Sequence, residues 1–185
     1  MIELKKVVCA YDGKIVLNGL DLSLPERGAI AVTGPSGAGK TTFLKLLAGL
    51  VPPASGSVEG LNGKRVSMVF QEDRLLPWRT ALENAALFCG SEVRAKEVLV
   101  ALELGGALDK RPDELSGGMR RRVAIARALC YGGDILLLDE PFKGLDDALK
   151  LRVAKRVKDA FPLTVLATHD MAEAVLMGCT ERIEL

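Results

Sequence analysis

The chain contains 185 residues, 49% of them hydrophobic and 26% charged, a balance typical of one soluble globular domain and not of a disordered or fibrous chain. Its 25 Lys and Arg residues and 24 Asp and Glu residues give a net charge of +1, which provides no global field for a nucleic acid. Four scattered cysteines and one histidine argue against a disulfide scaffold or a Cys/His zinc site, and favour a reducing, cytosolic compartment.

The first 25 residues predict a small antiparallel sheet. Apolar runs predict short strands over Ile2–Val8, Ile15–Leu17 and Leu20–Leu24. The dipeptides Asp12-Gly13 and Asn18-Gly19 separate these runs and are typical of tight turns.

Strands alternate with helices in the rest of the chain. Dense aliphatic and β-branched segments predict buried strands over Ala29–Thr33, Arg65–Phe70, Asp134–Leu138 and Leu163–Ala167, with a last strand over Arg182–Leu185. Apolar residues at helical spacing predict helices around Phe43–Leu50, Ala95–Leu102, Leu149–Val157 and Met171–Met177. This alternation predicts an α/β fold with a mostly parallel sheet. Residues 80–111 show only helical patterns and predict a small helical insertion.

The segment Gly34–Thr41 follows a predicted strand, precedes a predicted helix and matches the phosphate-binding pattern GxxxxGK[ST]. Glycines let successive backbone N–H groups curve around an anion, and the helix N-terminus adds a favourable dipole. We expect Lys40 to reach the β- and γ-phosphates, and the Thr41 hydroxyl to ligate Mg²⁺. The alternative is a glycine-rich turn without a ligand. The nucleotide-binding candidates here are Gly34, Pro35, Ser36, Gly37, Ala38, Gly39, Lys40, Thr41 and Thr42.

Two acids, Asp139 and Glu140, end the apolar run Ile135–Leu138. A carboxylate at the C-terminal edge of a parallel sheet lies beside the phosphate loop, where Mg²⁺ must be held. We therefore expect Asp139 to position the metal, and Glu140 to polarise a water for attack on the γ-phosphate. The alternative is an acidic strand end at a turn.

The segment Leu115–Met119 reads LSGGM and opens another predicted helix. By itself it is either an anion-competent helix N-terminus or a plain helix cap. With the other motifs, however, the chain resembles the nucleotide-binding subunit of ATP-binding cassette (ABC) transporters over nearly its whole length. The matching elements come in the order of that family: Tyr11, the P-loop, Gln71, Leu115–Met119, Asp139-Glu140, Gly144-Leu145-Asp146 and His169.

The resemblance implies a P-loop NTPase core in a single domain over residues 1–185, with a helical subdomain over about 80–130. It also implies that Tyr11 stacks on adenine, and that Gln71 touches both Mg²⁺ and the attacking water. Asp146 resembles the acid of the loop that links two active sites, and His169 resembles the switch histidine that contacts the γ-phosphate. Tyr11 as a packed edge aromatic, Gln71 as a polar strand end and His169 as a structural residue are the alternatives.

Members of the family work as head-to-tail dimers. The resemblance therefore implies that Ser116, Gly117 and Gly118 of one copy complete the ATP site of a second copy. It implies an ATPase on the inner face of the cell membrane, with transmembrane permease subunits as partners and a solute-binding protein as an indirect one. The alternative is a soluble ABC-type ATPase that acts on ribosomes or DNA, while the signature argues against an ordinary P-loop kinase.

The segment Leu75–Thr80 is similar to that in importers of nitrate, sulfonates, taurine and related small anions. In the family it borders the groove that receives the permease, and Trp78 in it is either a partner anchor or core filling. Two positions depart from the family: Met119 stands where Gln is usual, and Lys143-Gly144 where small residues are usual. Met119 would weaken the contact with the ribose of the opposite nucleotide or with its own loop, and Lys143-Gly144 the contact between the two sites.

Two basic clusters have simple expectations. Arg120, Arg121, Arg122 and Arg127 follow the signature, where basic residues are ordinary in the family, and we expect no nucleic-acid partner. A second set is expected to form a solvated helix face: Lys150, Arg152, Lys155, Arg156 and Lys158.

Overall fold

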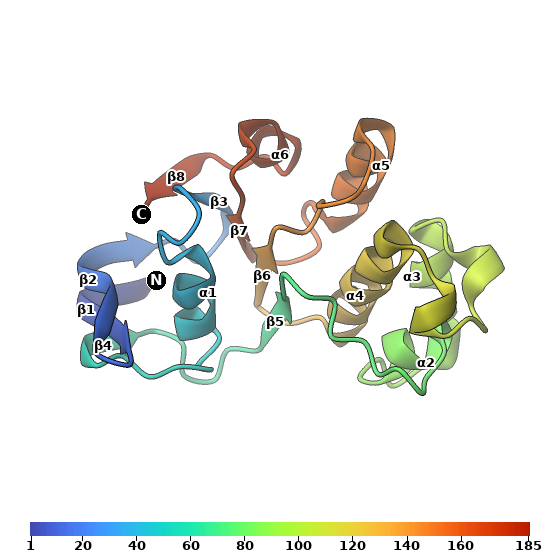
Figure 1. The fold of residues 1–185 in the computed structure, drawn as a ribbon, viewed down its shortest axis with the longest axis horizontal. Helices are drawn as coiled ribbons and strands as arrows, with labels where there is room; N and C mark the ends of the chain where they lie inside the picture. Colours follow the sequence, from blue (N-terminus) through green and yellow to red (C-terminus); the bar gives the residue numbers. More distant parts are fainter.

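The computed structural model describes all 185 residues and places an antiparallel sheet at one end of the molecule (Figure 1). This sheet has the strand order β2-β1-β4 and consists of β1 (Ile2–Tyr11), β2 (Lys14–Leu24) and β4 (Ser55–Glu59). The hairpin between β1 and β2 turns at Asp12 and Gly13, whose φ angles of 49° and 78° suit a two-residue primed turn.

The second turn predicted in this region, at Asn18-Gly19, is wrong, because β2 runs through both residues as one strand. Between the β1 residues Val7 and Cys9, β2 carries one residue more than its partner. Gly19, at a φ of 63°, absorbs the extra residue in a β-bulge, so a turn-forming dipeptide bends the strand without ending it. The polar, glycine-containing strand β4 was not predicted, since it has no apolar run.

The central sheet is parallel and has the strand order β5-β6-β7-β3-β8, which confirms the predicted α/β class. Its strands are β3 (Gly28–Thr33), β5 (Val66–Val69), β6 (Ile135–Asp139), β7 (Leu163–Ala167) and β8 (Glu181–Glu184). Every residue of β6 and β7 is buried, as expected for strands covered on both faces.

The carboxyl ends of four strands meet at one edge of this sheet. Asp139, the last residue of β6, pairs with Ala167 of β7, and Ala167 pairs with Val32 of β3. On the other side of β6, Leu138 pairs with Val69 of β5. The loops that follow these strands therefore share one edge, where ligands bind in open α/β sheets.

The helices form two groups (Figure 1). Beside the strands lie α1 (Lys40–Leu47), α5 (Asp147–Val157) and α6 (Met171–Leu176), and at the end opposite the antiparallel sheet lie α2 (Ala81–Ala86), α3 (Glu92–Ala101) and α4 (Gly117–Tyr131). Residues 80–111 contain α2, α3 and one short 3-10 turn (Gly105–Ala107), and no strand. None of the helices combines the length and the hydrophobicity needed to span a bilayer.

Candidate functional site

The phosphate-binding loop lies between β3 and the start of α1, as predicted. Gly39 has a φ of 100°, and a Cβ there would lie 2.8 Å from the side chain of Leu17, so only glycine fits this turn. The Lys40 ammonium donates hydrogen bonds to the carbonyl oxygens of Gly34 (2.7 Å) and Pro35 (2.9 Å). The lysine is thus held inside the curve of its own loop, where a bound phosphate would meet it.

A polar cavity of about 290 Å³ opens at this loop. It is lined by Val16, Ser36, Gly37, Gly39, Lys40, Thr41, Thr42, Gln71, Asp139 and Glu140. The structure thus brings nine of the predicted site residues together around one space. The tenth, Val16 of β2, was missed by sequence reasoning, because an apolar strand residue carries no signal that it will border a nucleotide.

Asp139 and Thr41 form the centre of this cavity. The Thr41 hydroxyl donates a hydrogen bond of 2.8 Å to the Asp139 carboxylate, which is almost fully buried at the end of β6. Burial raises the pKa of Asp139 above its ordinary value, while the hydrogen bond from Thr41 opposes this shift. A hydroxyl and a carboxylate in contact, with Gln71 lining the same cavity, are the hard oxygen donors that suit Mg²⁺ beside a phosphate.

Glu140 and His169 form a second polar pair at the same edge. The His169 Nδ1 atom lies 2.9 Å from the Glu140 carboxylate, although the imidazole is 74% exposed. This hydrogen bond raises the pKa of His169 above its ordinary value, because the carboxylate stabilises the imidazolium. Glu140 also has a φ of 49°, a conformation that costs energy for a residue with a side chain and is common at functional sites.

The signature segment does not line the cavity. Ser116 caps α4, its hydroxyl accepting a hydrogen bond of 3.3 Å from the Met119 N–H. A Cβ at Gly118 would lie 3.3 Å from the carbonyl oxygen of Gly144, so the signature packs against the loop that leads to Asp146. That loop and the signature therefore lie together, outside the residues that line the cavity.

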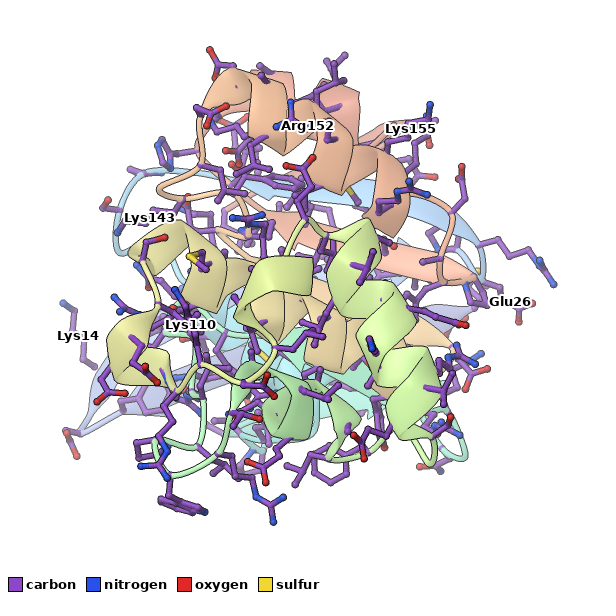
Figure 2. All side chains as sticks on the ribbon, turned by 90° about the vertical axis from the view of Figure 1, so that its right-hand side faces the viewer. Lys14, Glu26, Lys110, Lys143, Arg152 and Lys155 are labelled. Atoms are coloured by element: carbon purple, nitrogen blue, oxygen red, sulfur yellow. The ribbon has the colours of Figure 1, made fainter.

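Two other predicted site residues, Tyr11 and Asp146, stand on exposed surface outside the cavity. Tyr11 ends β1 with 43% of its surface exposed. Asp146 caps α5 by accepting a hydrogen bond of 2.9 Å from the Leu149 N–H. Lys143, one of the two departures from the family, is exposed on the surface next to Gly144 (Figure 2). The other departure, Met119, packs its side chain against the hydrophobic core instead of remaining free.

Two arginines of α4 hold the segment that begins at Gln71. The buried Arg121 guanidinium donates hydrogen bonds to the carbonyl oxygens of Phe70 and Gln71, and lies 3.4 Å from the Asp73 carboxylate. Arg127 donates to the carbonyl oxygens of Asp73 and Arg74, further along the same segment. Sequence reasoning treated these arginines only as a basic cluster, since no local pattern shows that they face inward.

Trp78 is 67% exposed, so its interpretation as core filling is wrong. Its loop is fixed by the fully buried Asn84. The Asn84 side-chain oxygen accepts a hydrogen bond from the Leu76 N–H, and its NH₂ group donates to the carbonyl oxygens of Leu76, Arg79 and Thr80. Asn84 was also missed, because a single polar residue in a helical pattern gives no signal of its partners.

One member of the expected solvated helix face is not solvated. The Lys150 side chain is only 18% exposed, and its ammonium lies 3.0 Å from the buried Glu173 carboxylate and 3.5 Å from that of Asp170. Its amphipathic position predicted a solvent-facing side chain, but α6 packs beside α5, and Glu173 of α6 and its N-cap residue Asp170 supply two acids there.

Comparison with known proteins gives the same result at three levels. A family model described as ABC transporter matches residues 17–143. The aliphatic sulfonates import ATP-binding protein SsuB 1 of Rhodococcus jostii is 44% identical over 177 residues, which cover 91% of this chain and 72% of that protein. The taurine import ATP-binding protein TauB of Escherichia coli O157:H7 is 39% identical, over 96% of this chain and 77% of that protein. A solved dimer of the ATP-binding cassette MJ0796, in a post-hydrolysis state with ADP and Pi, superposes with a TM-score of 0.88 at 30% identity, over 100% of this chain and 94% of that chain.

Proposed function

The chain belongs to the ABC transporter family, in which it is an ATP-hydrolysing subunit, and we propose that it works as a head-to-tail homodimer that drives an importer of organic sulfonates. Each ATP would lie between the phosphate loop of one copy and the signature of the other. ATP would close the pair, and loss of the γ-phosphate would reopen it, because each state has different contacts.

One observation supports the dimer above all: the nucleotide cavity of a single chain is incomplete. The cavity contains the P-loop and the acids of β6, but no residue of the signature. The signature instead packs beside the loop of Asp146, outside the residues that line the cavity. Two copies related by a twofold axis would bring each signature onto the P-loop of its partner. In a twofold interface, a contact from one patch of the first copy to another patch of the second is always repeated in the opposite direction.

The chain's own residues divide the chemistry between them. Lys40 would neutralise the β- and γ-phosphates, and Thr41, Asp139 and Gln71 would hold Mg²⁺, which screens the developing charge when it is bound with the phosphates. The cavity contains hydroxyl, carboxylate and amide oxygens, and few protein ligands are enough because the phosphates supply others.

Glu140 is the candidate base. Its carboxylate lines the phosphate cavity and is held by His169 at 2.9 Å, so it can accept a proton from a water aligned with the γ-phosphate. His169 itself is free to contact the γ-phosphate, because most of its imidazole is exposed. Tyr11 is proposed to stack on the adenine from the end of β1.

The permease is proposed to dock beside Gln71 and Trp78, which would hold the chain at the inner face of the membrane. An exposed tryptophan on a rigid loop is a favourable anchor for a protein interface. Arg121 ties the backbone of Gln71 to α4, the helix that begins with the signature. Movement of the permease surface can thus reach the phosphate site through direct contacts.

The solute is proposed from the relatives, whose names specify aliphatic sulfonates and taurine. A solute-binding protein would deliver it to the permease and would not touch this chain. Deletion of the gene should abolish uptake of a labelled alkanesulfonate and leave uptake of labelled nitrate unchanged. The reverse pattern would contradict the proposed solute class.

Complementation between two inactive variants tests the shared sites. Lys40→Ala disables the P-loop, and Gly117→Glu places a carboxylate where the partner's phosphate would bind. The glutamate should not disturb its own chain, since a Cβ at Gly117 meets nothing closer than 3.9 Å. Each variant alone should be inactive, and an equal mixture should regain activity up to about half of the wild-type rate, because only a mixed dimer has an intact site and it has one of two.

The matched control is the double variant Lys40→Ala/Gly117→Glu mixed with Lys40→Ala. No dimer in that mixture has an intact P-loop, so its rate should stay at background. A mixture of the two single variants that also stays at background would refute the trans arrangement, while leaving the family assignment in place.

A further inference from the structure

We infer that Lys150 and Glu173 form a link that holds the backbone around His169 against α5, the helix that Asp146 caps. Lys150 and Glu173 are thus positioning residues for His169. The inference rests on the roles proposed above for Asp146 and His169. It follows from three sets of contacts: those of Glu173, those of the backbone on either side of His169, and those of Lys150.

Glu173 is a buried carboxylate with both oxygen atoms engaged. Its residue is 4% exposed; one oxygen accepts a hydrogen bond of 2.7 Å from the Thr168 hydroxyl, and the other lies 3.0 Å from the Lys150 ammonium. Burying a charge is costly unless it is paired and hydrogen-bonded, and such pairs often add little net stability over apolar residues of the same volume. Stability therefore does not explain why Lys150 and Glu173 are paired. The explanation is the position that the pair imposes on Thr168 and the backbone beside it.

The same contacts fix the backbone before and after His169. The Thr168 hydroxyl, which donates to Glu173, also accepts a hydrogen bond of 3.1 Å from the Asp170 N–H. The Thr168 N–H in turn donates to the carbonyl oxygen of Val32 in β3. Both neighbours of the histidine are thus anchored, and only its side chain projects into the open.

The other end of the link lies one helical turn from the loop between the two proposed active sites. The Lys150 N–H donates a hydrogen bond of 2.8 Å to the carbonyl oxygen of Asp146, the residue that caps α5. A continuous series of direct contacts therefore runs from the turn of Asp146 through Lys150 and Glu173 to Thr168 and the peptide that follows His169. When the partner subunit displaces Asp146, such a series of contacts can transmit the displacement to His169, the residue proposed to contact the γ-phosphate.

Among the basic residues of α5, Lys150 is the one that reaches α6. Arg152 is paired with Glu103, outside both helices, and Lys155 is exposed on the same helix without an ion pair (Figure 2). Lys155 therefore offers a matched control with the same charge and the same helix.

The test compares Lys150→Met, Lys150→Arg and Lys155→Met by ATPase kinetics. In Lys150→Met we expect kcat to fall about tenfold with the KM for ATP within about twofold, because the P-loop is untouched and a catalytic group is displaced by a fraction of an ångström. Arginine should restore most of the rate by pairing with Glu173, and Lys155→Met should match the wild type. An unchanged kcat in Lys150→Met, or a loss that arginine does not rescue, would overturn the inference.

A second measurement separates this inference from the dimer model. His169 is the only histidine, so its imidazole signals in an NMR spectrum of the nucleotide-free chain are unambiguous. Those signals should shift in Lys150→Met and in Glu173→Gln, and stay in place in Lys155→Met. Unmoved signals would refute the link even if the complementation experiment succeeds, and shifted signals would support it even if that experiment fails.

Discussion

Single residues set the chemistry of this site through a few short contacts. Glu140 is held at a φ of 49° at the end of β6 and faces His169, while the preceding Asp139 turns to Thr41. Adjacent acids thus have different partners, which supports the different roles proposed for them. The positive φ at Glu140 is an energetically unfavourable conformation of the kind that is retained at functional sites.

The His169–Glu140 contact predicts the titration of the only histidine. Because Glu140 raises the pKa of His169, that pKa should lie above the usual value of about 6.5, and Glu140→Gln should lower it. By linkage, the contact contributes stability below the unfolded-state pKa and loses it as the pH rises through the raised folded-state value. NMR titration measures the pKa of His169 in the wild type and in Glu140→Gln, with the exposed Glu181→Gln as control. Equal pKa values in the wild type and Glu140→Gln would contradict the contact.

The Lys40 ammonium predicts the strength of nucleotide binding. Lys40→Ala removes charged hydrogen bonds to phosphate, which are worth about 1.5–3 kcal/mol each, so the affinity for ATP should fall at least about tenfold. Titration calorimetry measures the change. Lys45→Ala, on the same helix but outside the cavity, is the control and should bind ATP as the wild type does. Unchanged affinity in Lys40→Ala would refute the phosphate assignment.

At the scale of elements, polar side chains hold the loops to the helices around the site. Arg121 binds the backbone of Gln71 from α4, and Asn84 of α2 binds the loop of Trp78. These contacts span up to 50 positions in the chain, as with Arg121 and Gln71, and they replace hydrogen bonds that water would otherwise make. The loops at the proposed permease surface are therefore rigid supports and not free linkers.

Asn84 predicts how rigid the Trp78 loop is. Asn84→Ala removes the partner of the Leu76 N–H and of the Arg79 carbonyl oxygen, while the carbonyl oxygens of Leu76 and Thr80 keep backbone partners. The free energy of unfolding should therefore fall by about 1–3 kcal/mol. Urea denaturation measures this loss. Trp78 is the only tryptophan, so its fluorescence anisotropy should fall as the loop loosens. The exposed Asn62→Ala is the control, and unchanged anisotropy in Asn84→Ala would contradict the anchoring role of Asn84.

At the scale of the whole molecule, the separation of the signature from the P-loop cavity supports the proposal that catalysis needs two copies. Figure 1 shows the strands of the phosphate edge between the antiparallel sheet and the helices α2–α4, so in the proposed dimer one chain would supply halves of two different sites. The rate of such an enzyme depends on the concentration of dimer, since association and ATP binding are linked.

Glu140→Gln predicts a trapped dimer. The amide keeps the size of the side chain but cannot accept a proton, so ATP should bind, turnover should stop and the closed pair should accumulate. Light scattering should show a dimer with ATP and a monomer without it. The control is Glu140→Gln combined with Lys40→Ala, which should stay monomeric. A monomer of Glu140→Gln with ATP present, or a wild-type rate per chain that does not fall on dilution, would contradict the shared-site model.

Local motifs allowed much of this protein to be predicted from the amino-acid sequence. Periodicity and residues that are neighbours in the chain determine the P-loop, the acids after Leu138, and the alternation of strands and helices. Partners far away in the sequence determine the features that were missed: the bulge at Gly19, the strand β4 and the inward-facing side chains of Arg121, Asn84 and Lys150. Propensity and pattern carry no information about such partners, because it is tertiary packing that decides whether a polar side chain meets water or a buried group.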